Sequence, residues 1–138
     1  MGRILALDYG KVRTGIAITD PLKMIASGLT TVETTTLFDF LDKYLENEEV
    51  DLIVVGQPRQ MQDLPSASEV YITKFIAEFQ ARYPEIVLER QDERFTSKLA
   101  VKSMIEGGLK KKKRRDKALI DEISATLILQ AYLDRREN

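Results

Sequence analysis

Three acidic residues stand at positions where a folded chain could use them for chemistry. Asp8 ends an apolar run, Glu93 follows a second apolar run, and Asp121 lies in the last candidate helix. Carboxylates that are brought close together repel one another unless a cation or a proton lies between them. One or two divalent cations held by such oxygens can support phosphoryl transfer. Asp8, Glu93 and Asp121 are therefore the candidate catalytic and metal-binding residues.

Each acid also has a simpler interpretation. Asp8 precedes Gly10 by two positions and could be an ordinary turn acid. Glu93 could sit near a helix N-terminus, where the helix dipole favours an acid. Asp121 could be a helix-start acid or could pair with Lys117 one helical turn earlier. The functional hypothesis depends on the three acids together and on their placement.

Asp121 is the most unusual of the three in its helical context. Asp116 is the better N-cap candidate for this helix. An acid on the inward face of a helix is rare, and small neighbours would let the helix approach a sheet closely. The residues that share the face of Asp121 are small or largely apolar: Ser124, Ala125, Ile128 and Tyr132.

The composition narrows the chemistry further. The chain contains no histidine and no cysteine. This excludes disulfides, thiolate and imidazole metal ligands, and nucleophile–histidine arrangements. Acid–base and metal chemistry must come from carboxylates, Lys, Arg or Tyr. Oxygen ligands suit the hard cations Mg²⁺, Mn²⁺ and Ca²⁺.

Basic residues are concentrated in one short segment. The window 110–117 holds seven of the 21 basic residues and one of the 22 acidic residues, so the rest of the chain carries a net charge of −7. A charge run can be a solvated loop, but this density favours contact with nucleic-acid phosphates. Aromatic residues do not interrupt it, which argues against base stacking. The candidate contacts are Lys110, Lys111, Lys112, Lys113, Arg114 and Arg115, together with Arg13 and Arg94.

Length and hydropathy indicate an ordinary globular domain. We expect residues 1–138 to form a single domain with its own core. No apolar run approaches the roughly 20 residues that span a bilayer. The N-terminus does not resemble a signal peptide, since a candidate strand ending in an acid begins at once. A cytoplasmic protein without a membrane partner is the expectation.

Apolar periodicity predicts five strands and four helices. The predicted strands cover residues 3–8, 14–19, 25–33, 52–56 and 86–88. The predicted helices cover residues 36–48, 66–83, 96–105 and 117–135. Thr36 with Asp39, and Ser66 with Glu69, resemble capping boxes. The order predicts an α/β fold with a mixed five-stranded sheet, three antiparallel strands followed by two parallel ones, and helices on both faces.

Three sequence blocks carry a resemblance to a known family over essentially the whole chain. They are residues 6–17, residues 92–97 and residues 121–130, with a weaker fourth block at 55–58. Their combination and order resemble the YqgF/RuvX family, a branch of the RNase H-like superfamily related to the RuvC Holliday-junction resolvases. The loop 57–65 departs from the family pattern. The second acid follows the fifth strand, whereas in the resolvases it follows the fourth.

The resemblance implies both a fold and an activity. The implied fold is RNase H-like, with the first strand central and the fourth and fifth strands beside it. Asp8, Glu93 and Asp121 would be the metal-binding acids of an enzyme that hydrolyses nucleic-acid phosphodiesters with Mg²⁺ or Mn²⁺. The implied role is 5′-end maturation of pre-16S rRNA in ribosome biogenesis, with precursor rRNA or ribosomal precursor particles as partners.

Two other functions stay open from the sequence. The same metal chemistry could act on branched DNA, as in a Holliday junction resolvase. The chain could instead be a non-catalytic nucleic-acid-binding or ribosome-assembly module. Cleavage of a precursor rRNA end, cleavage of a four-way junction, and binding without cleavage would separate the three.

Overall fold

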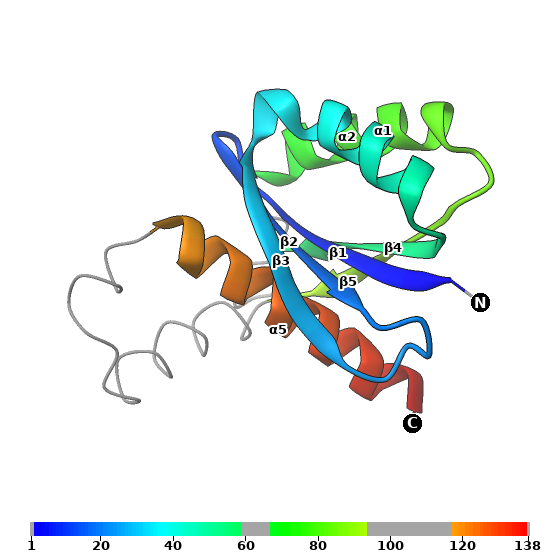
Figure 1. The fold of residues 1–138 in the computed structure, drawn as a ribbon. Coiled ribbons are helices and arrows are strands. Elements are labelled where there is room, and N and C mark those ends of the chain that lie inside the picture. The colour runs from blue at the N-terminus through cyan, green and yellow to red at the C-terminus, as the bar shows by residue number, and fades with distance from the viewer. Residues whose placement is uncertain (1, 59–66, 94–116, 138) are drawn as a thin grey trace, which may run out of the picture.

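The computed structural model describes residues 2–58, 67–93 and 117–137 (Figure 1). The strands are β1 (Arg3–Tyr9), β2 (Arg13–Thr19), β3 (Ala26–Glu33), β4 (Val50–Gln57) and β5 (Val87–Asp92). The helices are a 3-10 turn (Thr34–Thr36), α1 (Leu37–Asn47), α2 (Glu69–Arg82) and α5 (Lys117–Glu137). The predicted helix over 96–105 lies outside the described residues.

The strands form one mixed sheet in the order β3-β2-β1-β4-β5. β1 pairs antiparallel with β2, and β2 pairs antiparallel with β3. β4 is parallel to both β1 and β5. The predicted fold class and the predicted central position of the first strand are confirmed. That residues 1–138 form a single domain stays a prediction.

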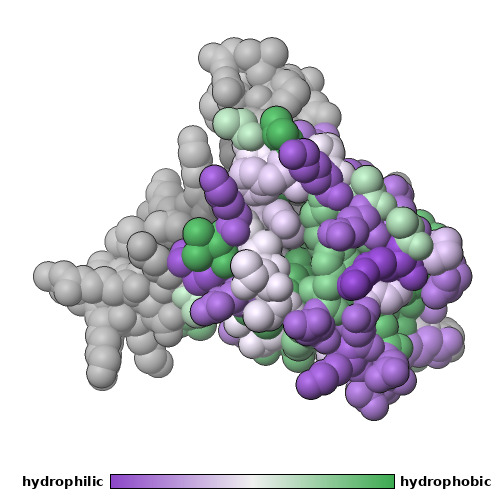
Figure 2. Space-filling model, turned by 90° about the horizontal axis from the view of Figure 1, so that it is seen from above, coloured by the Kyte–Doolittle hydropathy of each residue, from purple (hydrophilic) through white to green (hydrophobic). Residues whose placement is uncertain are grey.

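Helices cover both faces of the sheet, with α1 and α2 on one side and α5 on the other (Figure 1). β1 is buried from both sides, because Leu5 and Leu7 belong to the cluster under α1 and α2. Ile4 and Ala6 face α5 instead, where they pack with residues such as Ile128. This alternation explains why the strand is apolar throughout. The surface seen from the α1/α2 side is largely hydrophilic (Figure 2).

Two predicted helix starts differ from the structure. Thr36 makes no side-chain cap, because its hydroxyl donates backward to the carbonyl of Glu33 at 2.8 Å. α2 begins at Glu69 rather than near Ser66, which lies outside the described residues. The carboxylate of Glu69 binds Arg90 of β5. The first predicted capping box is therefore wrong, whereas the second involves Ser66, outside the described residues, and stays a prediction.

The last strand and the last helix are longer than the sequence predicts. β5 runs on to Asp92, and the N–H of Glu93 still donates to the carbonyl of Gln57 at 3.2 Å. α5 extends to Glu137. Among the described residues, no helix is long and apolar enough to cross a membrane.

Candidate active site

Asp8 lies near the end of the central strand, on the face that α5 covers. It pairs with Gly15 of β2 in the antiparallel register. Burial, and then the negative charge of Asp121, raise the pKa of Asp8 from 3.8 to about 6. A turn acid exposed to water would show no such shift. Asp8 is therefore a partly buried acid that lies close to another acid.

α5 brings Asp121 to Asp8 by crossing very close to β2. A Cβ built on Gly15 would stand less than 3 Å from the backbone carbonyl oxygen of Asp121, a separation that real Cβ atoms essentially never show. Only glycine allows this approach. The face predicted for Asp121 is confirmed, because Ser124, Ala125, Ile128 and Tyr132 are all buried.

The simpler interpretation of Asp121 as a helix-start acid is wrong, because the first turn of α5 contains no acid. Its described ion-pair partner comes from β2. Arg13 Nε donates to Asp121 Oδ2 at 2.9 Å, and the two side chains are 37% and 23% exposed. Arg13, predicted to contact phosphate, thus lies at the acidic cluster and stays partly accessible to solvent. Asp116 and the side chain of Lys117 lie outside the described part.

Glu93 reaches the same cluster from the end of β5. Its carboxylate lies over Gly56, where a Cβ would stand less than 3 Å from Glu93 Oε2. Burial, and then the charge of Asp8, raise the pKa of Glu93 from 4.5 to about 8, although nearby Arg90 opposes the shift. Because Asp8 ionises at lower pH, Glu93 titrates against an Asp8 that is already charged.

Glycines flank Asp8 on both sides of the central strand, a feature that sequence reasoning missed. Gly15 lies across the register on β2, and Gly56 follows Val55, the β4 partner of Leu7. Their missing side chains leave the space that Asp121 and Glu93 occupy. A glycine inside a buried strand is the signal that could have found this frame.

Asp8 interacts electrostatically with each of the other two acids, but the three carboxylates do not form one closed group. Asp121 acts on the pKa of Asp8, and Asp8 acts on the pKa of Glu93. Among the described residues, no three acidic side chains gather closely enough to enclose one metal ion. The donor set still fits hard divalent cations, because all three acids offer carboxylate oxygens, and burial together with a neighbouring carboxylate raises the pKa values of Asp8 and Glu93. The assignment of all three as metal ligands stays a prediction.

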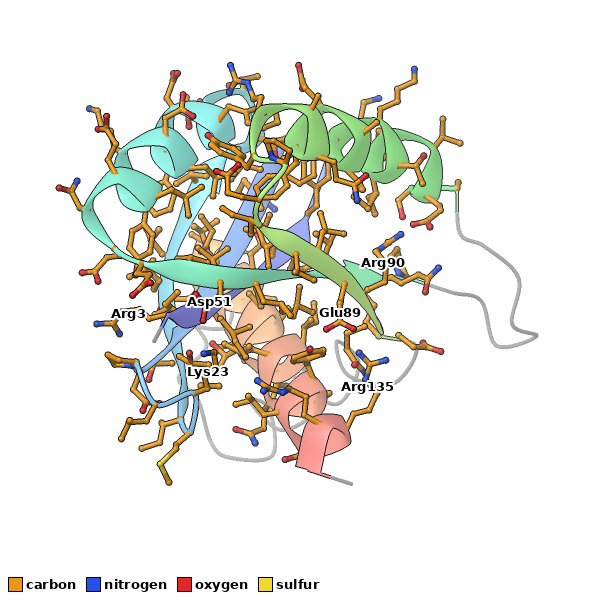
Figure 3. The ribbon with its side chains drawn as sticks, turned by 90° about the vertical axis from the view of Figure 1, so that its right-hand side faces the viewer. Arg3, Lys23, Asp51, Glu89, Arg90 and Arg135 are labelled. Atoms are coloured by element: carbon orange, nitrogen blue, oxygen red, sulfur yellow. The ribbon has the colours of Figure 1, made fainter. Side chains whose placement is uncertain are left out.

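Arg90 supports the site from the opposite face of β5 (Figure 3). Its guanidinium binds both carboxylate oxygens of Glu69, at 2.8 and 2.9 Å. It also donates to the carbonyls of Val55 at 3.2 Å and Gly56 at 2.9 Å. This clamp joins α2, β4 and β5 beside the position where Glu93 crosses Gly56. No pattern in the sequence distinguishes Arg90 from other basic residues.

The remaining predicted contacts, Arg94 and the basic segment Lys110, Lys111, Lys112, Lys113, Arg114 and Arg115, lie outside the described residues.

The structure resembles the "Thermus thermophilus RuvC structure" with a TM-score of 0.50, covering 97% of this chain and 96% of that one. At 13% identity this likeness shows the fold, an α/β fold of the RuvC-like RNase H type. The RuvX family, described as "Holliday junction resolvase", matches residues 2–135. The chain belongs to the RuvX family, so the predicted family is confirmed.

Curated relatives match at high identity over nearly their whole length. A protein of Christiangramia forsetii is 65% identical over 133 residues, covering 96% of this chain and 98% of the relative. A protein of Flavobacterium psychrophilum is 54% identical, covering 99% of each chain. A protein of Porphyromonas gingivalis is 54% identical, covering 97% of each. All three are named "Putative pre-16S rRNA nuclease".

Proposed function

We propose that this protein is a divalent-cation-dependent nuclease that hydrolyses phosphodiesters at the 5′ end of precursor 16S rRNA. The names of its relatives support the substrate, and rRNA maturation would place its work in the cytoplasm. One observation carries the chemistry. Glycines flank a partly buried acid, Asp8, and let two more acids approach it. A fold rarely holds buried carboxylates against one another unless a cation or reaction uses them.

Asp8, Glu93 and Asp121 would hold Mg²⁺ or Mn²⁺ through their carboxylate oxygens. The bound cation would supply Lewis-acid stabilisation of the phosphate and activation of water. The protein's part is to orient the carboxylates on β1, just after β5 and on α5. Glu93, with a pKa of about 8, is mostly protonated at pH 7 in the absence of a cation, so cation binding would displace a proton.

Arg13 would orient the nucleic-acid backbone beside these acids. A guanidinium binds phosphate oxygens in a bidentate manner, and Arg13 is already placed at Asp121. Arg94 and the basic segment 110–115 remain candidate phosphate contacts on their charge alone. Together they would position RNA, or a ribosomal precursor particle that contains it, over the end of β1.

Branched DNA is the second candidate substrate, because the family description names a Holliday junction resolvase. The carboxylate chemistry is the same for both substrates. Whether the protein acts on RNA or on branched DNA depends on which nucleic-acid backbone geometry the basic residues can bind. A non-catalytic binding module is disfavoured by the raised pKa values of Asp8 and Glu93, which a purely structural acid would avoid.

The test compares substrates directly. The purified protein is incubated with Mg²⁺ or Mn²⁺ and either a labelled precursor 16S rRNA end or a four-way DNA junction. Cleavage of the RNA that depends on both the cation and Asp8 is the expected result. Cleavage of the junction alone would assign the resolvase function. Salt-sensitive RNA binding without cleavage of either substrate would contradict the proposal.

A further inference from the structure

Gln91 of β5 presents its side chain to the same face of the sheet as the acidic site. Glu89, two residues earlier, bonds the hydroxyl of Tyr132 on α5. Figure 3 shows Glu89 on the side of α5 and Arg90 on the other side of the strand. Because alternate residues of a strand point to the same face, the side chain of Gln91 lies on the same face of the sheet as those of Glu89 and Glu93.

The amide oxygen of Gln91 is buried and has no hydrogen-bond donor among the residues that the structure describes. Its amide nitrogen donates to the carbonyl of Asp92 at 3.3 Å, which fixes the orientation of the group. A buried carbonyl without a donor destabilises the fold by about 1–3 kcal/mol. Such atoms are rare in native proteins and call for an explanation.

The position of Gln91 in the sheet explains why its amide oxygen has no donor among the described residues. Gln91 pairs with Gly56 in the parallel register of β4 and β5. Gly56 is also the residue over which the Glu93 carboxylate lies, and it is beside Asp8 on the central strand. Gln91 therefore belongs to the row of the sheet that contains Gly56, and the Glu93 carboxylate lies over that row. Side-chain amide oxygens, like carboxylates, are ordinary ligands of hard cations.

We propose that Gln91 supplies a neutral oxygen ligand for the divalent cation bound by the acidic site. This inference rests on the proposed function, since it concerns the same cation. A neutral oxygen adds a donor to the site without adding to the repulsion that already raises the pKa values of Asp8 and Glu93. Cation binding would also satisfy the buried carbonyl.

The experiment measures Mn²⁺ affinity by calorimetry and thermal unfolding in chelator, using the full chain. Gln91→Met keeps the length of the side chain and removes its oxygen, whereas Gln91→Glu keeps an oxygen donor. Gln80→Met, at an exposed position of α2, is the matched control. Gln91→Met should raise the Kd for Mn²⁺ at least about tenfold, because loss of even an outer-shell partner of a metal ligand weakens binding by about that factor. Its Tm in chelator should be no lower than that of the wild type.

Gln91→Glu should bind Mn²⁺ more tightly than Gln91→Met, and Gln80→Met should match the wild type. Suppose that the wild type binds Mn²⁺ and Asp8→Asn does not. An unchanged Kd for Gln91→Met would then overturn the inference and leave the proposed function standing. A wild type that binds no Mn²⁺ would overturn the proposed function itself, and the inference with it.

Discussion

The two ends of β1 place acids in opposite surroundings. Near the beginning of β1, Asp51 of β4 accepts hydrogen bonds from the ammonium of Lys23 at 2.9 Å and from the N–H of Gly2 at 3.0 Å. These hydrogen bonds hold its pKa below the ordinary value. Figure 3 shows Arg3, Lys23 and Asp51 gathered at this end. At the other end of the strand, the pKa values of Asp8 and Glu93 are raised.

This difference shows how a fold distinguishes structural acids from candidate functional ones. Asp51 is partly exposed and matched by a cation of the chain, so its charge costs little. Asp8 is partly buried next to Asp121, whose described ion-pair partner, Arg13, is directed at Asp121 rather than at Asp8. Within the described residues, an acid is paired with a cation at one end of the sheet, whereas carboxylates lie beside one another at the other end.

The largest effect should come from neutralising one acid at each end. Asp8→Asn should reduce RNA cleavage by at least about 1,000-fold, because it removes the acid that both other carboxylates adjoin. Asp51→Asn should leave cleavage unchanged and lower the Tm slightly. Single-turnover rates and thermal unfolding measure both variants. If Asp51→Asn impaired cleavage as much as Asp8→Asn, the two ends would not differ as described.

The glycines offer a sharper comparison on a single face of the sheet. Gly15→Ala would drive a Cβ into the backbone carbonyl of Asp121 and displace α5. Small displacements of catalytic groups cost about 100-fold in rate, which is the loss expected here. Gly28→Ala is the matched control, because its Cβ would meet only the flexible side chain of Glu122. Equal losses of cleavage rate in the two variants would contradict the proposed glycine frame.

The end of the sheet that holds Asp8 and Glu93 should also set the pH dependence of stability in chelator. Asp8 and Glu93 hold protons more tightly in the folded state, so the stability that they confer is present below about pH 4. It is lost as the pH rises through about 6 for Asp8 and about 8 for Glu93. For Asp8 this amounts to up to about 3 kcal/mol.

Urea unfolding measures this loss at pH 5 and pH 8. Asp8→Asn should be more stable than the wild type at pH 8, and the advantage should shrink at pH 5. A variant that is less stable than the wild type at pH 8 would mean that the Asp8 carboxylate is well compensated in the folded protein.

The smallest effect concerns Arg13. Arg13→Gln removes a partly exposed ion pair, so unfolding free energy should fall by less than about 1 kcal/mol. If Arg13 contacts a phosphate, the log–log salt slope of RNA binding should become shallower by about one unit. RNA binding measured over a range of salt concentrations tests this. An unchanged slope would limit Arg13 to its pairing with Asp121.

The sequence predicted the elements around the site better than their contacts. The apolar runs of β1 and β4 and the helical spacing of α5 placed Asp8 and Asp121 on facing surfaces, because burial imposes strict periods on strands and helices. The capping box predicted at Thr36 is wrong, and the carboxylate of Glu69 binds Arg90 on a distant strand. Such long-range pairings leave no local pattern. The roles of Gly56 and Gln91 likewise emerge only once β4 and β5 are paired.

A cation titration that counts protons tests the central claim most directly. Mn²⁺ binding is measured by calorimetry in buffers of different ionisation enthalpy at pH 7 and pH 9. If Glu93 and Asp8 take part in binding with pKa values of about 8 and 6, the wild type should release about one proton per site at pH 7 and far fewer at pH 9. Asp8→Asn should bind weakly or not at all. Tight binding without proton release at pH 7, or binding that survives Asp8→Asn, would contradict the account.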